Sequence, residues 1–433
     1  MDSRLLVTCL LAFSIEMCYS QLLESDNKNK KGVEFQKDLS WEEIKAKAKE
    51  EHKFIFVDLY ATWCAPCKQM DRIVYTDNEL GNFLNKHFIS VKVQIDSSKD
   101  DDNYIRTWYP EAGAMMDTYK ITGLPSYLFF SPDGNIVHRQ KGGRNVKDFL
   151  AIVKDALNID RQYYSLVAKY RNGRKDYSSI PYMARLARSI SEKDFSDSLA
   201  RDYIENIMND SEEENWMNKA NLQFIGAFED VLSSRDYVFN VFYHQSGKID
   251  SIVGDVQYSQ RVLEYTITKE EITPKLKQMK TGDPVWAEMM RTIAKKYGKS
   301  LAESSVLESK LKWYNQRKDW SNVIKYNIEK VEKYGVDTST MGRILLNNMI
   351  YEVIFKHSTD KKSLKWAIGR MKIIVKADST DALNMDTYAN LLYKSGRKSE
   401  GLQWERKAVG LEPNNQDLQT ALRKMQKGSP TWD

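Results

Sequence analysis

Apolar runs and amphipathic segments alternate up to about residue 160. Residues 54–60 form an apolar run, and residues 89–95 alternate apolar and polar positions, so both segments predict strands. Apolar residues at 127–130 and 136–137 flank a turn sequence and predict a hairpin. Helical periods predict helices at 41–51, 64–74, 80–87 and 145–157. This order of elements predicts a central sheet that is covered by helices on both faces.

After residue 160 helical periods dominate, with glycine or aspartate at the turns between them. The segment 251–268 is the one place where a strand could lie. Further helical pairs are expected at 311–331 and 344–375. The pattern therefore predicts an all-α region over residues 159–433.

One helical pair, residues 385–414, resembles a tetratricopeptide repeat. The residues at its packing positions are Tyr388, Ala389, Leu392, Gly396, Ala408 and Pro413. Gly401 and Glu405 depart from the alanine and aromatic residue that are usual in this repeat. The resemblance predicts a tetratricopeptide-like region, with its clearest repeats at 303–425.

Length and charge narrow the function classes. A chain of 433 residues exceeds what one hydrophobic core usually supports, so two or three domains are expected. The net charge of +5 is small beside 65 basic and 60 acidic residues, and the basic residues do not gather into an arm or patch. The composition therefore predicts no nucleic-acid partner.

The N-terminus has the pattern of an export signal. A weakly cationic start leads into an apolar stretch at 5–15 that is too short to span a bilayer, and small residues precede Gln21. Residues 1–20 are interpreted as a signal peptide and residues 21–32 as a polar linker, with a buried N-terminal helix as the alternative. No integral membrane segment is predicted, and the expected location is outside the cytoplasm, in a bacterial periplasm.

Cleavage before Gln21 would leave two of the four cysteines, Cys64 and Cys67. Two thiols three residues apart at a strand-to-helix junction are suited to passing a disulfide to another protein. A disulfide between them closes almost no loop and adds little stability. The pair is therefore interpreted as reactive rather than structural.

Metal binding is the rival use of such a pair. The chain has no second CxxC motif, and its five histidines are scattered without ligand spacing. Structural zinc is therefore disfavoured and no metal site is predicted, although transient copper delivery by the pair stays open as an alternative.

Residues 33–158 resemble the thioredoxin superfamily. The resemblance lies in residues 57–68, which hold a strand, a buried aspartate and the CxxC loop in register, in strand 91–96, in the cis-proline loop at 123–125, and in Gly142. A helical insertion at 97–118 departs from a minimal thioredoxin. The resemblance implies an α/β thioredoxin fold, a central mixed sheet flanked by helices, as in periplasmic thioredoxin-like proteins fused to helical repeats.

The resemblance assigns roles to four residues. Cys64, at the exposed start of a helix, would attack the substrate disulfide, and Cys67 would resolve the mixed disulfide. Asp58 would be buried and accept the proton of Cys67, and Lys92 matches the family residue that pairs with it. A purely structural ion pair is the alternative for Asp58 and Lys92.

Four further residues are expected to contact substrate: Trp63, Pro66, Leu124 and Pro125. The loop at Pro125 would pair with an extended substrate segment, unless Pro125 is an ordinary trans-proline. Trp63 would shield the site or simply pack on the surface. The aromatic and methionine residues at 104–119 would form either a substrate-binding lip or core.

Together these features predict an exported thiol-disulfide oxidoreductase that needs no cofactor. It would act on protein disulfides as a reductase or isomerase and receive electrons from an upstream thiol donor. The dipeptide Ala65-Pro66 lacks the histidine of strong oxidants, which favours reduction. The helical region would bind partners or a second protomer. The alternative is a helical scaffold whose thioredoxin unit serves for docking or metal delivery.

Overall fold

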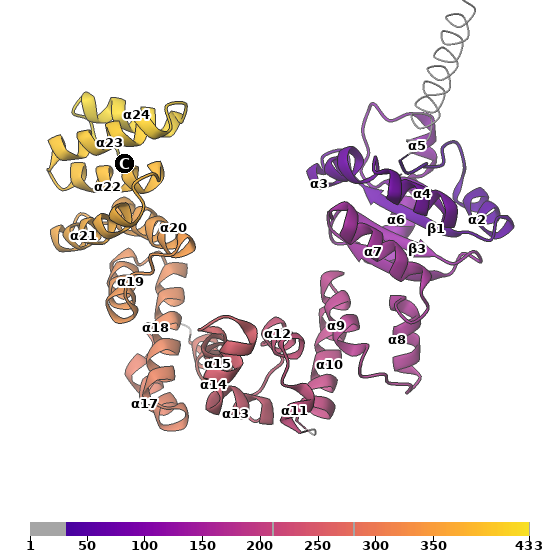
Figure 1. The fold of residues 1–433 in the computed structure, drawn as a ribbon, viewed down its shortest axis with the longest axis horizontal. Helices are drawn as coiled ribbons and strands as arrows, with labels where there is room; N and C mark the ends of the chain where they lie inside the picture. The colour runs from indigo at the N-terminus through magenta and orange to yellow at the C-terminus, as the bar shows by residue number, and fades with distance from the viewer. Residues whose placement is uncertain (1–31, 210–211, 280–281, 433) are drawn as a thin grey trace, which may run out of the picture. The chain divides into compact units, whose positions relative to one another are not determined.

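A computed structural model describes residues 32–209, 212–279 and 282–432 (Figure 1). The predicted signal peptide and all but the last residue of the predicted linker lie outside these ranges. The chain forms two compact units, Met1–Leu232 with Asp236–Val238, and Ser233–Arg235 with Phe239–Asp433. Within the described ranges, no helix has the length and hydrophobicity needed to cross a membrane.

The first unit contains a four-stranded sheet in the order β2-β1-β3-β4. Its strands are β1 (Phe54–Tyr60), β2 (Phe88–Gln94), β3 (Ser126–Phe130) and β4 (Ile136–Lys141). The pair β1–β2 is parallel, and the pairs β1–β3 and β3–β4 are antiparallel, so the predicted mixed sheet and hairpin are confirmed. Gly134 takes a positive φ of 79° in the hairpin turn, a conformation that glycine adopts without steric cost.

Helices cover both faces of the sheet, as predicted. They are α2 (Trp41–Glu50), α3 (Ala65–Gln69), the π-helix η1 (Met70–Val74), α4 (Asn78–His87), α5 (Asn103–Thr107), α6 (Tyr109–Thr118) and α7 (Val146–Leu157). Phe56 and Phe129 pack with η1, α4 and α7 on one face, while Val57 and Leu128 pack with α2 and α6 on the other. This division follows from the alternation of side chains along each strand.

Capping residues mark the starts of α2 and α7. Ser40 and Glu43 form a capping box before α2, and the Asn145 side chain caps α7 by accepting the Asp148 N–H.

The insertion at 97–118 forms α5 and α6 and contributes to the core. Trp108 and Met115 are 3% and 4% exposed, and they pack against the face of the sheet that holds Val57 and Leu128. These burials favour the core interpretation of this aromatic segment over a substrate-binding lip.

More helices complete the first unit: α8 (Tyr163–Arg171), α9 (Ile180–Ser189), α10 (Lys193–Tyr203), the π-helix η2 (Ile204–Met208), α11 (Glu213–Trp216) and α12 (Lys219–Ala227). Two of them, α8 and α9, contact β4 directly. The predicted boundary at residue 158 therefore lies inside a compact unit.

Buried hydrogen bonds attach the segment after residue 158 to β4. The Tyr163 N–H donates to His138 Nδ1 at 3.1 Å, and Arg139 Nη2 donates to the Ile190 carbonyl at 3.1 Å. Burial lowers the pKa of His138 to about 3, so the imidazole stays neutral and Nδ1 can accept this hydrogen bond. The segment after residue 158 thus supplies hydrogen-bond partners for two buried side chains of β4, His138 and Arg139.

The second unit is helical throughout its described residues. Its helices are α13 (Tyr237–His244, whose first two residues belong to the first unit), α14 (Ser246–Val253), α15 (Tyr258–Ile267), η3 (Thr268–Ile272), α16 (Thr273–Gln278), α17 (Trp286–Tyr297), α18 (Lys299–Gln316), α19 (Trp320–Tyr334), α20 (Thr340–Met349), η4 (Ile350–Phe355), α21 (Lys361–Ala377), α22 (Ala382–Lys394), α23 (Lys398–Leu411) and α24 (Gln416–Gln426).

The idea of a strand at 251–268 is wrong. Val262, Leu263 and Ile267 are buried on α15, at helical spacing, and Gly254 ends α14 in a left-handed conformation. The short apolar runs in this segment are helix faces.

The repeat-like pair 385–414 forms α22 and α23, and Gly401 lets the two helices approach closely. A Cβ at Gly401 would lie 2.8 Å from the Ala389 carbonyl oxygen and 2.9 Å from the Tyr393 nitrogen. Glu405 is fully buried, and burial raises the pKa of its carboxyl. The two departures from the repeat pattern thus lie inside the contact between these helices.

Candidate redox site

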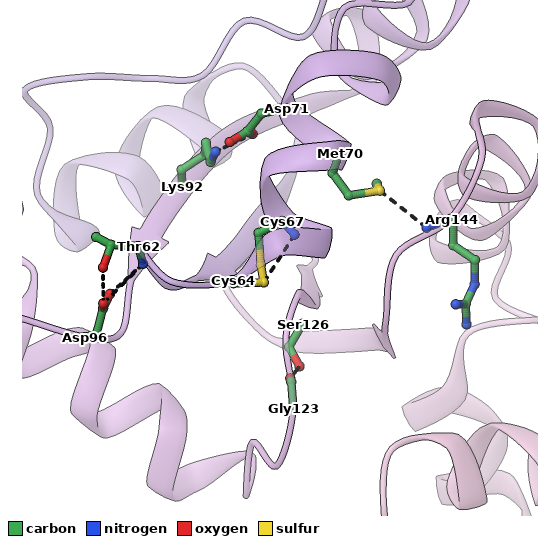
Figure 2. The surroundings of a disulfide bond; sticks show 10 residues. All are labelled: Thr62, Cys64, Cys67, Met70, Asp71, Lys92, Asp96, Gly123, Ser126 and Arg144. Carbon is green, nitrogen blue, oxygen red and sulfur yellow. Dashed lines mark hydrogen bonds and ion pairs between the residues drawn. A yellow bond between two sulfur atoms is a disulfide. The ribbon is translucent and has the colours of Figure 1, made fainter. Parts of the chain in front are cut away.

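The cysteine pair lies where the chain leaves the central strand. Strand β1 ends at Tyr60, and Cys64 is the N-cap residue of α3, with Pro66 in the first turn. Cys64 and Cys67 form a disulfide, and the Cys67 N–H donates to Cys64 Sγ at 3.2 Å (Figure 2). The predicted position of Cys64 at a helix start is confirmed.

The expected exposure of Cys64 is wrong for this disulfide form, because both cysteines are 2% exposed. They pack with Ala61 and Leu124 in a small apolar cluster. Trp63 beside them is 71% exposed, so an accessible aromatic surface adjoins a largely covered sulfur pair.

The loop that faces the cysteines contains a cis peptide bond between Leu124 and Pro125, as predicted. The Gly142 N–H donates to the Pro125 carbonyl at 2.8 Å, and Ser126 Oγ donates to the Gly123 carbonyl at 2.7 Å. The first bond ties the loop to the residue after β4, and the second closes the loop on itself. Leu124 packs against the cysteine pair, and Pro125 follows it in the same loop.

Asp58 lies in the middle of β1 and is 1% exposed. Burial raises the pKa of its carboxyl to about 7, while the positive charge of Lys92 opposes this rise. Its Oδ1 has no hydrogen-bond partner among the described residues. The carboxyl of Asp58 can therefore take up and release a proton near neutral pH.

Lys92 lies opposite Asp58 on β2, but its ammonium pairs with Asp71 of η1 (Figure 2). The Lys92 Nζ also lies 4.5 Å from the centre of the Tyr60 ring. The expectation that Lys92 pairs with Asp58 therefore needs correction: the ion pair is with Asp71, although the charge of Lys92 still acts on Asp58. Asp71 is partly exposed and offers the ammonium a solvated partner.

The sequence interpretation missed two carboxylates at this site. Asp71 follows Cys67 by four residues, which is one helical turn, and this spacing could have revealed it. Asp96 accepts the Thr62 N–H at 3.0 Å and so fixes the loop before Trp63. No comparable signal identified Asp96, since its partner is distant in sequence.

A metal centre finds no support in the part of the chain that the structure describes. No group of three or more His, Cys, Asp or Glu side chains is arranged there to hold an ion. His138, which is fully buried, bonds to the Tyr163 N–H instead.

Comparison with known proteins identifies the domain. Residues 41–157 match the family model of a thioredoxin-like domain. The thiol:disulfide interchange protein DsbD of Colwellia psychrerythraea is 29% identical over 158 residues, which are 35% of this chain and 24% of that protein. The chloroplastic thioredoxin Y1 of Arabidopsis thaliana is 35% identical over 107 residues, which are 25% of this chain and 52% of that protein.

A solved DsbH oxidoreductase has 22% sequence identity and a TM-score of 0.25, with 30% of this chain and 87% of that chain covered. The chain thus spans about a quarter of the DsbD relative and about half of the chloroplast thioredoxin. Residues 41–157 are a thioredoxin-like domain, homologous to thiol:disulfide interchange proteins, that carries a CxxC pair.

Asp58→Asn should stabilise the domain in a pH-dependent way. Between pH 4 and 7 the folded state keeps a proton that the unfolded state has released, so the wild type loses stability as the pH rises through this window. The variant should unfold with a free energy about 2–4 kcal/mol higher than wild type at pH 8, and with little difference at pH 4. Urea unfolding at both pH values measures this, and an equal difference at the two values would contradict it.

Proposed function

We propose that the protein is a thiol-disulfide oxidoreductase that reduces or isomerises disulfides of other proteins through Cys64 and Cys67. One observation carries the proposal: the two sulfurs form a disulfide against the Leu124–Pro125 loop, at the end of the strand that holds the buried Asp58. The similarity to DsbD relatives, which are thiol:disulfide interchange proteins, supports the same reaction.

The reaction begins from the reduced pair. The Cys64 thiolate attacks one sulfur of the substrate disulfide, that bond breaks, and one substrate thiolate leaves. The Cys67 thiolate then attacks Cys64 Sγ and releases the second substrate thiolate, which leaves the Cys64–Cys67 disulfide seen in Figure 2. Two electrons pass to the substrate, and an upstream dithiol donor must return them.

Asp58 is proposed to accept the proton of Cys67 in the second step. Its raised pKa suits this role, because a base works best when its pKa lies near the working pH. If Asp58→Asn keeps its fold but reduces disulfides more slowly than wild type near pH 7, this role is supported. An unchanged rate of disulfide reduction would show that Asp58 has only a structural role.

The direction of transfer is proposed to be reduction or isomerisation. Between the cysteines the chain has Ala65 and Pro66, and no histidine to stabilise the reduced form as in strong oxidants. A measured reduction potential of the Cys64–Cys67 pair decides this point.

Cys67→Ser should accumulate mixed disulfides between Cys64 and partner proteins, because the intermediate forms but cannot be resolved. Cys64→Ser should accumulate almost none, and the double Cys→Ser variant gives the background. Non-reducing electrophoresis followed by mass spectrometry of the trapped species measures both. Equal trapping by the two single variants would contradict the assigned roles.

The helical second unit is proposed to bind partner proteins. A groove of about 360 Å³ lies among α20, α22 and α24, and its lining is rich in amide and hydroxyl side chains. The side chains that line the groove include those of Asn347, Asn390 and Lys424. Such groups can bond to polypeptide backbone, and Asn347 Oδ1 is buried without a partner among the described residues. A spacer or scaffold role is the alternative.

A Cys67→Ser chain that ends after Val238 tests this role. It keeps the first compact unit, including the helices that cover His138, and lacks the groove. It should react with a small disulfide at the full-length rate but trap few of the partners of the full-length variant. Recovery of the same partners at the same yield would show that the second unit does not bind them and acts as a spacer.

Export to the periplasm is also part of the proposal, and it rests on the signal-like pattern of residues 1–20. The intact mass of the protein recovered from its native host should correspond to a chain that begins at Gln21. A retained N-terminus or a lipid adduct would overturn this assignment.

A further inference from the structure

Two positive charges on the surface beside the disulfide have no carboxylate partner among the residues that the structure describes. They belong to Arg144, at the loop after β4, and to Lys141, at the end of β4. We propose that this surface selects substrates with acidic residues next to the reactive cysteine. The inference rests on the proposed function and names the substrate class of the same site.

Arg144 adjoins the active-site helix. The neighbouring Gly143 lies against Pro66, since a Cβ at Gly143 would be 3.5 Å from the Pro66 Cβ. The Arg144 N–H donates to Met70 Sδ at 3.4 Å (Figure 2). The Arg144 guanidinium donates to the Gly143 carbonyl at 2.9 Å. Within the described residues no carboxylate pairs with this guanidinium, so its charge is available to a ligand.

Lys141 lies beside the cis-proline loop. Its side chain covers Gly123, and Nζ donates to Ser191 Oγ at 2.9 Å and to Thr122 Oγ1 at 3.4 Å. These partners are neutral hydroxyls, which hold the ammonium in place and leave its charge uncompensated. The turn between α9 and α10 thus fixes a cation at the edge of the loop that faces the cysteines.

Several carboxylates around the site bond to other groups, and Asp148, in the first turn of α7 after Arg144, accepts a hydrogen bond from the Asn145 side chain at 2.9 Å. Glu192 pairs with Arg139 at 3.5 Å, and Asp71 pairs with Lys92. Asp96 bonds to Thr62, on the opposite side of the disulfide from Arg144 (Figure 2). Lys68, directly after Cys67, is exposed and adds a further positive charge. Lys141 and Arg144 therefore place two positive charges beside the cis-proline loop, where their side chains lie against Gly123 and Gly142.

A substrate segment that lies along the cis-proline loop would place its side chains over this surface. An extended segment presents alternate residues to the protein. Glutamate or aspartate at these positions would meet Lys141 and Arg144, while lysine there would be repelled. The exposed Trp63 ring offers an apolar contact at the same site.

Three disulfide-bonded peptides test the proposal on the full-length protein, with dithiothreitol as electron donor. They share one sequence and carry Glu, Gln or Lys on both sides of the cysteine. The wild type should reduce the Glu peptide with a kcat/KM about tenfold above the Lys peptide at low salt. In about 0.5 M salt this preference should fall below about twofold, because exposed charges are screened.

Variants assign the effect to this surface. Arg144→Gln and Lys141→Gln should each lower kcat/KM for the Glu peptide about two- to fivefold relative to the Gln peptide, and Arg144→Lys should restore the preference. Lys86→Gln is the matched control. Lys86 is exposed at the end of α4, next to the start of β2, and therefore at the opposite end of the sheet from the cysteines.

The outcomes separate the two proposals. If the wild type reduces none of the peptides, the proposed function fails. If it reduces all three at equal rates, or if Lys86→Gln changes the preference as much as Arg144→Gln, the function stands and the inference about acidic substrates is overturned.

Discussion

The burial of strand β1 on both faces and both edges is the constraint on which the site depends. Strand β1 pairs with β2 and β3, and its inner residues are inaccessible to solvent. The strand carries Asp58 into the core, and its end fixes where the chain leaves the sheet toward Cys64. A buried strand that ends directly before the cysteines thus sets the positions of both the carboxyl and the sulfurs.

Burial shifts the pKa values of Asp58 and His138, two buried titratable groups of this unit, in opposite directions. It raises the pKa of Asp58 to about 7, so this carboxyl can exchange a proton near neutrality. It lowers the pKa of His138 to about 3, so this imidazole stays a neutral acceptor for the Tyr163 N–H. The same physical effect makes the first group suited to chemistry and the second to holding helices on the sheet.

The sequence predicted what is encoded locally. The strands follow from apolar runs, the helix starts from Ser40 and Asn145, and the sulfur pair from the spacing of Cys64 and Cys67. It did not predict contacts between distant segments. The sequence suggested a strand at 136–137 only, because His138 and Arg139 are polar. In the structure both are buried, and segments from beyond residue 158 supply their hydrogen-bond partners.

The contact of α8 and α9 with β4 makes these helices part of the same compact unit as the redox site. Strand β4 is an edge of the sheet, and an uncovered edge is open to pairing with other chains. The α9–α10 turn contacts this edge through Ile190 and Glu192, and through Ser191 it reaches Thr122, three residues before Pro125. The helices that protect the edge strand therefore also support the loop that faces the disulfide. A substrate that lies along this loop would meet residues held in place by the turn between α9 and α10.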